Sequence, residues 1–142
     1  MPYRVRWEGH GVYRRFYGTL SAQDIRNACE EIAADPRHDD IRYVLSDFLE
    51  ASPALSDQEA RALKQLERVR FFDNPDVVNA VIATNPRLFG CIPYLESADR
   101  APCPIAHFTA VSEARNWVAA NPRLSWFRGT RESHRSPSLS HG

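Results

Sequence analysis

The alternation of hydrophobic and polar residues predicts a β-hairpin at the amino end of the chain. Residues 3–8 alternate hydrophobic with charged side chains, which is the period of a strand with one buried face. The glycines of residues 9–11 supply a turn, because glycine adopts positive φ angles at little cost. In the next strand Arg14 shares a face with Val12 and Phe16, and this predicts a bulge near Arg14 and Arg15.

Helix-forming segments alternate with short apolar runs along the rest of the chain. Helices are expected to begin at Ser21, Ser56 and Ser112, because a serine side chain satisfies free amide groups at a helix start. The second of these helices has a capping-box pair, Ser56 and Glu59. Its apolar stripe consists of Leu63, Leu66 and Val69.

Three further strands are expected over residues 41–48, 77–84 and 104–111, which are rich in β-branched and aromatic residues. The segment 85–95 contains a glycine and a proline that predict a short or kinked helix. The resulting order, β-β-α-β-α-β-α-β-α, predicts an α/β fold with a mixed β-sheet and flanking helices.

One domain is expected over residues 1–122, followed by a basic C-terminal tail over residues 123–142. The tail has four arginines against one glutamate, a net charge of about +3. Its polar composition predicts that it is largely disordered. Trp126 and Phe127 lie in this tail, and they either fold back onto the domain or contact a second copy of the chain, which would give a homodimer.

The amino-acid composition indicates which classes of partner, cofactor and location to expect. Basic and acidic residues are equal in number, and a formal net charge of zero gives no support for nucleic-acid binding. The three cysteines have no metal-ligand spacing, so neither a metal nor a cofactor is expected. No apolar stretch has the length of a membrane span and the amino end has no apolar signal core, so we expect a cytoplasmic protein.

Four stretches of the sequence have a familiar order and spacing: YGTLSAQDIRNACEEI, YVLSDF ending in Asp47, NAVIAT, and AHFTAVSEARNWVAAN. Over roughly residues 3–121 the chain resembles the STAS domain, the fold of bacterial anti-sigma-factor antagonists of the SpoIIAA type. It resembles more closely the SpoIIAA-like branch of small bacterial proteins. We therefore expect a non-enzymatic binding or regulatory module that recognises a partner protein or a small apolar, lipid-like ligand.

The resemblance also raises a phosphorylation hypothesis at Ser56. STAS regulators carry a phosphorylated serine at the start of the helix after the central strand, within an Asp-Ser-Ser-Gly-like segment. Here Asp47 ends the predicted strand, and Ser56 follows a loop without an adjacent glycine. Asp57 and Glu59 in the first turn would repel a phosphate, so a helix cap is the favoured interpretation of Ser56. A phosphoregulated anti-sigma-factor antagonist is the alternative.

A ligand-binding crevice is expected beyond the strand that ends at Thr84, because ligands gather at the carboxyl ends of parallel strands. Arg87, Asp47 and the loop 49–56 are expected to rim it. An apolar group lies beside it and consists of Leu88, Phe89, Ile92, Tyr94 and Leu95. This group either packs onto the sheet or covers an apolar ligand pocket.

An enzymatic site is the remaining alternative. His107 lies in the last predicted strand, and Asp47 ends a central one, so the two side chains could meet. This hypothesis requires both residues to point into one cleft. The sequence contains no GxSxG, HExxH, GxGxxG or Walker motif that would support it.

Overall fold

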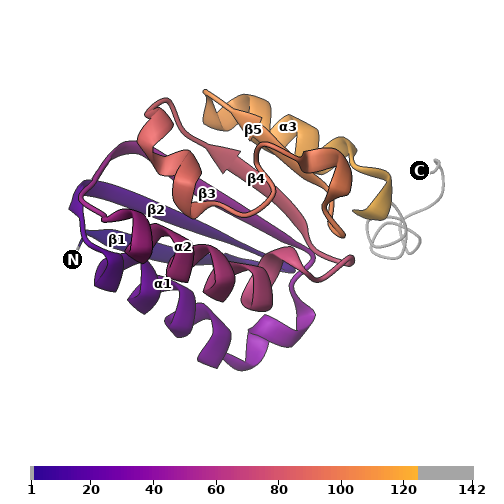
Figure 1. The fold of residues 1–142 in the computed structure, drawn as a ribbon. Helices are drawn as coiled ribbons and strands as arrows, with labels where there is room; N and C mark the ends of the chain where they lie inside the picture. Colours follow the sequence, from indigo (N-terminus) through magenta and orange to yellow (C-terminus); the bar gives the residue numbers. More distant parts are fainter. Residues whose placement is uncertain (1, 125–142) are drawn as a thin grey trace, which may run out of the picture.

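A five-stranded mixed β-sheet forms the centre of the protein in a computed structural model that describes residues 2–124 (Figure 1). The strands lie in the order β1-β2-β3-β4-β5, so each strand is beside its neighbour in the sequence. Strand β1 is antiparallel to β2, and all other neighbours are parallel. The predicted mixed sheet with flanking helices is therefore confirmed. Trp126 and Phe127 lie outside the described residues.

The structure defines the bounds of each element. The strands are β1 (Tyr3–Glu8), β2 (Gly11–Leu20), β3 (Tyr43–Pro53), β4 (Val78–Ile82) and β5 (Ile105–Phe108). The α-helices are α1 (Ala22–Ala34), α2 (Asp57–Glu67) and α3 (Val111–Ala120). Five shorter helical turns are η1 (Pro36–Asp40), η2 (Arg68–Phe72), η3 (Pro86–Cys91), η4 (Ala98–Arg100) and η5 (Pro122–Leu124). The expected short helix after β4 is the 3-10 turn η3.

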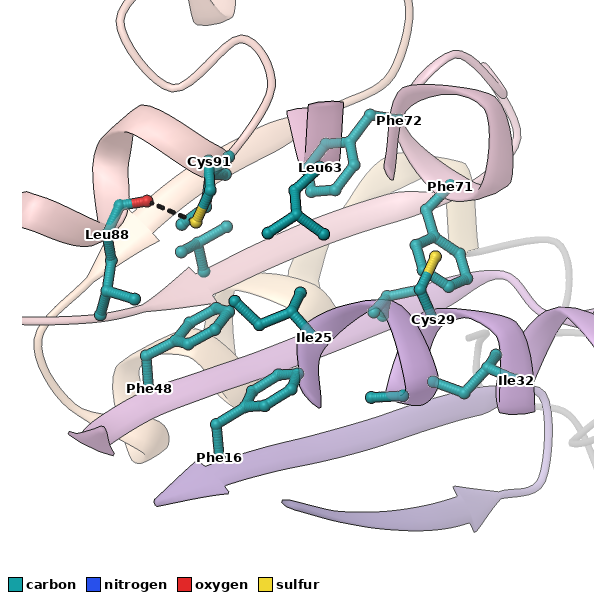
Figure 2. Packing of buried hydrophobic residues seen from close by; sticks show 14 of the residues in the cluster. Phe16, Ile25, Cys29, Ile32, Phe48, Leu63, Phe71, Phe72, Leu88 and Cys91 are labelled. Atoms are coloured by element: carbon teal, nitrogen blue, oxygen red, sulfur yellow. Dashed lines mark hydrogen bonds between the residues drawn. The ribbon is translucent and has the colours of Figure 1, made fainter. Parts of the chain in front are cut away.

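The two faces of the sheet carry different layers. Helices α1 and α2 lie side by side on one face, and α3 lies on the other (Figure 1). Under α1 and α2, Phe16 and Phe48 stack with ring centroids 4.6 Å apart, and Cys29 and Leu63 complete the packing (Figure 2). Under α3, side chains of β3 and β4 pack against the buried Ala114 and Val118 of the helix. Among residues 2–124, no helix has the length and apolar character to cross a membrane.

A buried ion pair joins helix α2 to the sheet. Arg14 points into the α1–α2 side of the sheet, where both of its terminal nitrogens donate to the carboxylate of Glu67 at the end of α2. Its Nε donates to the Ser46 hydroxyl at 2.8 Å, and its guanidinium lies over the Phe71 ring, 5.0 Å from the centroid. The irregularity expected near Arg14 and Arg15 is present in the pairing of β2 with β3, where the register shifts between Arg15 and Tyr17, while the β1–β2 pairing is regular.

The segment after Glu67 corrects the predicted apolar stripe of the second helix. The α-helix ends at Glu67 and continues as the π-turn η2. A π-turn places more residues in each turn than an α-helix does, so the pattern of buried positions shifts. As a result Phe71 and Phe72 are buried, whereas Val69 is 73% exposed.

We expect that removing one member of the Arg14–Glu67 ion pair destabilises the protein strongly, and that replacing both members with apolar residues does not. Glu67→Leu leaves the Arg14 charge buried without a counter-ion, so the free energy of unfolding should fall by about 3–5 kcal/mol. The double variant Arg14→Met/Glu67→Leu removes both charges and should recover most of that loss. Urea denaturation of the three proteins measures this, and a double variant no more stable than Glu67→Leu would contradict it.

Candidate functional site at the start of helix α2

A surface groove of about 610 Å³ lies between the amino end of α2 and the turn η3. One wall is the segment from Pro53 to Asp57 together with Ala60 on the first turns of α2. The other wall is formed by Pro86, Arg87 and Gly90 of η3. The groove therefore lies beyond the carboxyl end of β3, where an open parallel sheet generally presents its binding loops.

The wall on α2 is held in place by a capping box. Ser56 Oγ accepts a hydrogen bond from the amide of Glu59 at 3.1 Å, and the Glu59 carboxylate accepts one from the Ser56 amide at 2.9 Å. The same arrangement begins α1, where Ser21 pairs with Asp24. The predicted serine caps at Ser21 and Ser56 are therefore present. At Ser112 the expectation was wrong, because α3 begins one residue earlier, at Val111, after Ala110.

The opposite wall exposes its polar side and buries its apolar side. Asn85 Oδ1 accepts a hydrogen bond from the Arg87 amide at 3.0 Å and so begins the η3 turn. Leu88 and Ile92 are buried in the core under α1 and α2. Arg87 is exposed, and its guanidinium makes no hydrogen bond or ion pair with another residue of the described chain.

The rest of the expected apolar group packs beside the core instead of lining the groove. Phe89 contacts the His107 ring edge-on, with centroids 5.0 Å apart. Tyr94 and Leu95 are half-buried and pack against the cluster under α1 and α2. Tyr94 OH donates to Asp73, and its backbone adopts a φ of 63°. Of the residues predicted from the sequence, the structure brings Ser56 and Arg87 together in the groove.

Asp47 lies away from this groove. The expected strand end at Asp47 was wrong, because β3 continues to Pro53 and pairs there with the end of β2. The Asp47 side chain is on the α3 side of the sheet, where it accepts hydrogen bonds from Tyr13 OH at 2.5 Å and from the Leu49 amide at 3.0 Å. Partial burial and the Asp47 hydrogen bond raise the pKa of Tyr13 to about 12, so Tyr13 remains a neutral donor at physiological pH.

Asp47 and His107 lie on opposite faces of the sheet. Asp47 is in register with Ile82, which packs under α3. His107 is in register with Val81, which packs under α1 and α2. His107 Nε2 lies 2.6 Å from the Ala83 carbonyl oxygen. The two side chains therefore do not point into one cleft, as an Asp47/His107 enzyme would require.

The three cysteines are buried, and they belong to no metal-binding cluster in the described part of the chain. Cys29, Cys91 and Cys103 are buried free thiols, and burial raises the pKa of Cys91 to about 12. Within residues 2–124, no three histidine, cysteine or acidic side chains are arranged to hold a metal ion.

Sequence reasoning missed two groups of polar residues. Arg14 occupies a core-facing position between Val12 and Phe16, and Glu67 follows Leu63 by one helical turn, so an ion pair across the core could have been inferred from the two patterns. The second group, around Tyr13 on the α3 side, gave no local signal, because it depends on the pairing of three strands.

Comparison with known proteins identifies the fold. No protein-family model and no curated protein matches the chain. The structure of the Bacillus cell fate determinant SpoIIAA in its phosphorylated form matches with a TM-score of 0.52 and 13% identity, over 82% of this chain and 98% of that one. The anti-sigma factor antagonist SpoIIAA in its unphosphorylated form matches with a TM-score of 0.52 and 11% identity, over 84% and 99%.

A third structure, an uncharacterized DUF3478-family protein with a SpoIIAA-like fold from Shewanella loihica, has a TM-score of 0.48 and 15% identity, over 81% and 90%. The two SpoIIAA structures show that this chain has the SpoIIAA, or STAS, fold, and the resemblance found in the sequence is confirmed at the level of the fold.

The two capping boxes provide a matched test of Ser56. Ser56→Ala and Ser21→Ala each remove one cap hydrogen bond, so each should lower the free energy of unfolding by about 1 kcal/mol. Urea denaturation measures both. A loss at Ser56 much smaller than at Ser21 would contradict the view that this hydroxyl stabilises the start of α2.

Proposed function

We propose that the protein is a non-enzymatic binding module of the cytoplasm that recognises a partner protein through the groove between α2 and η3. The observation that carries the proposal is the exposed, unpaired Arg87 facing the capped start of α2 across an open groove. SpoIIAA, which shares the fold, is described as an anti-sigma factor antagonist, and this description supports a regulatory role through binding.

The lining of the groove favours a protein segment over a small apolar ligand. Sites for apolar small molecules enclose most of the ligand within an apolar pocket. Here Leu88 and Ile92 are buried in the core. The groove is lined by Ser56, Asp57 and Arg87 beside Leu55, two prolines and small residues. A surface of this kind suits the polar rim and modest apolar contacts of a transient protein interface.

Phosphoregulation at Ser56 is a second candidate function. The supporting observations are the exposure of Ser56 at the groove and the phosphorylated form of SpoIIAA. A phosphate on Ser56 would gain from the helix dipole and from the nearby Arg87. It would also break the cap to Glu59 and meet the charges of Asp57 and Glu59, so we rank this function second.

Two groove variants test the proposed function. A Cβ added at Gly90 would meet only Ala60 Cβ, at 4.0 Å, so Gly90→Leu should fold and fill the groove. Arg87→Glu reverses the unpaired positive charge at the groove. Cross-linking in host cytosol followed by mass spectrometry should recover a partner with the wild-type chain and lose it with both variants.

Arg100→Glu is the matched control, because it makes the same charge change at an exposed arginine outside the groove. This control should retain the partner. If Gly90→Leu recovered as much of the partner as the wild-type chain does, the groove would not be the binding site. Native mass spectrometry of the purified protein separates the alternatives, since a retained small molecule would favour ligand binding and an added phosphate would favour phosphoregulation.

A further inference from the structure

The face of β1 and β2 opposite α1 and α2 is covered by no helix of residues 2–124. Helix α3 packs against β3, β4 and β5 and leaves the hairpin side of the same face open (Figure 1). Strand alternation directs a set of arginine and tyrosine side chains onto this open surface and its border with α3. This arginine–tyrosine face consists of Arg4, Arg6, Tyr13, Arg15, Tyr17 and Arg115.

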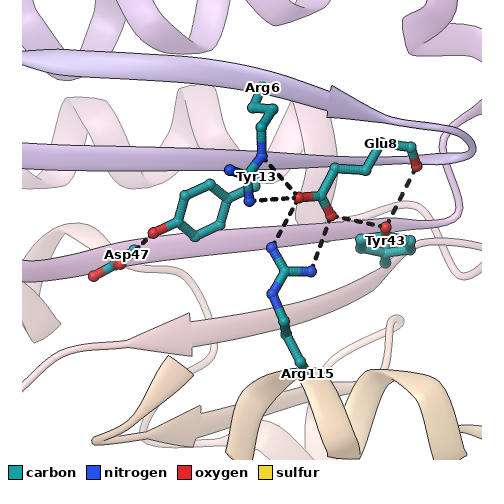
Figure 3. Close-up of polar contacts among 6 residues, drawn as sticks. All are labelled: Arg6, Glu8, Tyr13, Tyr43, Asp47 and Arg115. Carbon is teal, nitrogen blue, oxygen red and sulfur yellow. Dashed lines mark hydrogen bonds and ion pairs between the residues drawn. The ribbon is translucent and has the colours of Figure 1, made fainter. Parts of the chain in front are cut away.

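Glu8 holds two of these arginines in place from opposite sides (Figure 3). Arg6 donates to the Glu8 carboxylate at 3.0 and 3.2 Å, and Arg115 of α3 donates to it at 2.8 and 3.1 Å. Tyr43 OH donates to the same carboxylate at 3.0 Å. Both guanidinium groups also lie against the Tyr13 ring, at 4.9 and 5.4 Å from its centroid. These contacts fix the positions of both cations before any partner arrives.

A second arginine–tyrosine group continues the face along the strands. Arg15 forms an ion pair with Glu50 of β3, and its guanidinium lies 5.9 Å from the centroid of the Tyr17 ring. Arg4 Nε donates to Tyr17 OH at 3.3 Å, and Arg4 has no acidic partner within the described chain. An arginine has more N–H donors than these contacts use, so donors remain free for a bound acceptor.

Burial separates the charges of this face into two layers. The Arg6, Arg15 and Arg115 side chains are 64%, 43% and 38% exposed. Asp47 is 5% exposed and the Glu8 side chain 17%, so these two acids lie beneath the arginines. Glu50, the ion-pair partner of Arg15, is itself exposed. The surface that a partner would meet is therefore cationic and aromatic.

We propose that the arginine–tyrosine face is a second docking surface, and that its occupant is a carboxylate-rich segment of a partner protein. Charge complementarity carries the choice, because guanidinium groups bind carboxylates in paired hydrogen bonds. Tyrosine and arginine are also among the side chains enriched at protein interfaces. Their fixed positions lower the entropic cost of binding.

Three other occupants fit less well. A second copy across a two-fold axis would place the same arginines opposite one another. The chain's own residues 125–142 carry three arginines against one glutamate and would be repelled. A nucleic acid is disfavoured by the formal net charge of zero. The surface lies on the face opposite α2, so this proposal does not depend on the groove.

The test titrates the full chain with a short synthetic peptide of alternating glutamate and valine at low ionic strength. Two-dimensional NMR measures which backbone amide shifts change and how tightly the peptide binds. Backbone amide shifts should concentrate in β1 and β2. Arg4→Glu/Arg15→Glu should weaken peptide binding by at least about tenfold, since charge-assisted hydrogen bonds are lost and repulsion is gained. The milder Arg4→Gln/Arg15→Gln should give an intermediate loss and guards against misfolding of the charge-reversed protein.

The control Arg61→Glu/Arg100→Glu makes the same net charge change at exposed residues outside the face. The control variant should bind the peptide as tightly as the wild-type chain does. If it lost as much affinity as Arg4→Glu/Arg15→Glu, overall charge would explain the effect and the proposal would be overturned. Amide shifts centred away from β1 and β2 would do the same. Tighter binding of oligothymidylate than of the peptide would assign the face to a nucleic acid, and a dimer in sedimentation that Arg4→Glu/Arg15→Glu abolishes would assign it to a second copy.

Discussion

The Arg14–Glu67 ion pair is the contact on which the position of helix α2 depends. Along its length, α2 buries only Leu63 and Glu67 fully, while Ala60 and Leu66 pack partly buried against the same core. The cost of removing both charges from water is offset by the two-pronged geometry, by Ser46 on Nε and by the Phe71 ring. Because α2 also forms one wall of the groove, a core contact determines where that surface site lies.

The helices cover the two faces of the sheet unequally, and this asymmetry determines which surfaces stay open. Two helices cover the face that contains Arg14, and the groove arises only at the end of that layer, between α2 and η3. One helix covers part of the other face, and Arg115 joins it to the hairpin through Glu8. Gly11 contributes to this junction, since a Cβ there would collide with the Tyr43 ring. The hairpin and α3 are thus joined by polar contacts around an open surface.

Local patterns predicted the elements well because their causes are local. The capping boxes at Ser21 and Ser56 each lie within four residues, and strand alternation lies within one strand, so the order of elements and the fold could be predicted. The end of β3 could not, because residues 50–53 become a strand only by pairing with Tyr17–Leu20 of β2. The Asp47/His107 site failed for a related reason. Alternate residues of a strand point to opposite faces of the sheet. Whether Asp47 and His107 share a face therefore depends on the register between the strands, which only the folded sheet defines.

The distribution of charge over the surface distinguishes binding surfaces that the net charge alone does not reveal. The formal total of zero gives no support for a polyanion that contacts the whole molecule. The same total conceals a surface where arginines lie outward and the acids Glu8 and Asp47 lie beneath them. At a separation of a few ångströms, a partner carboxylate interacts mainly with the outer layer, because salt and water screen more distant charges. A neutral protein can therefore bind an acidic partner segment, provided that the fold places its own acids under its own arginines.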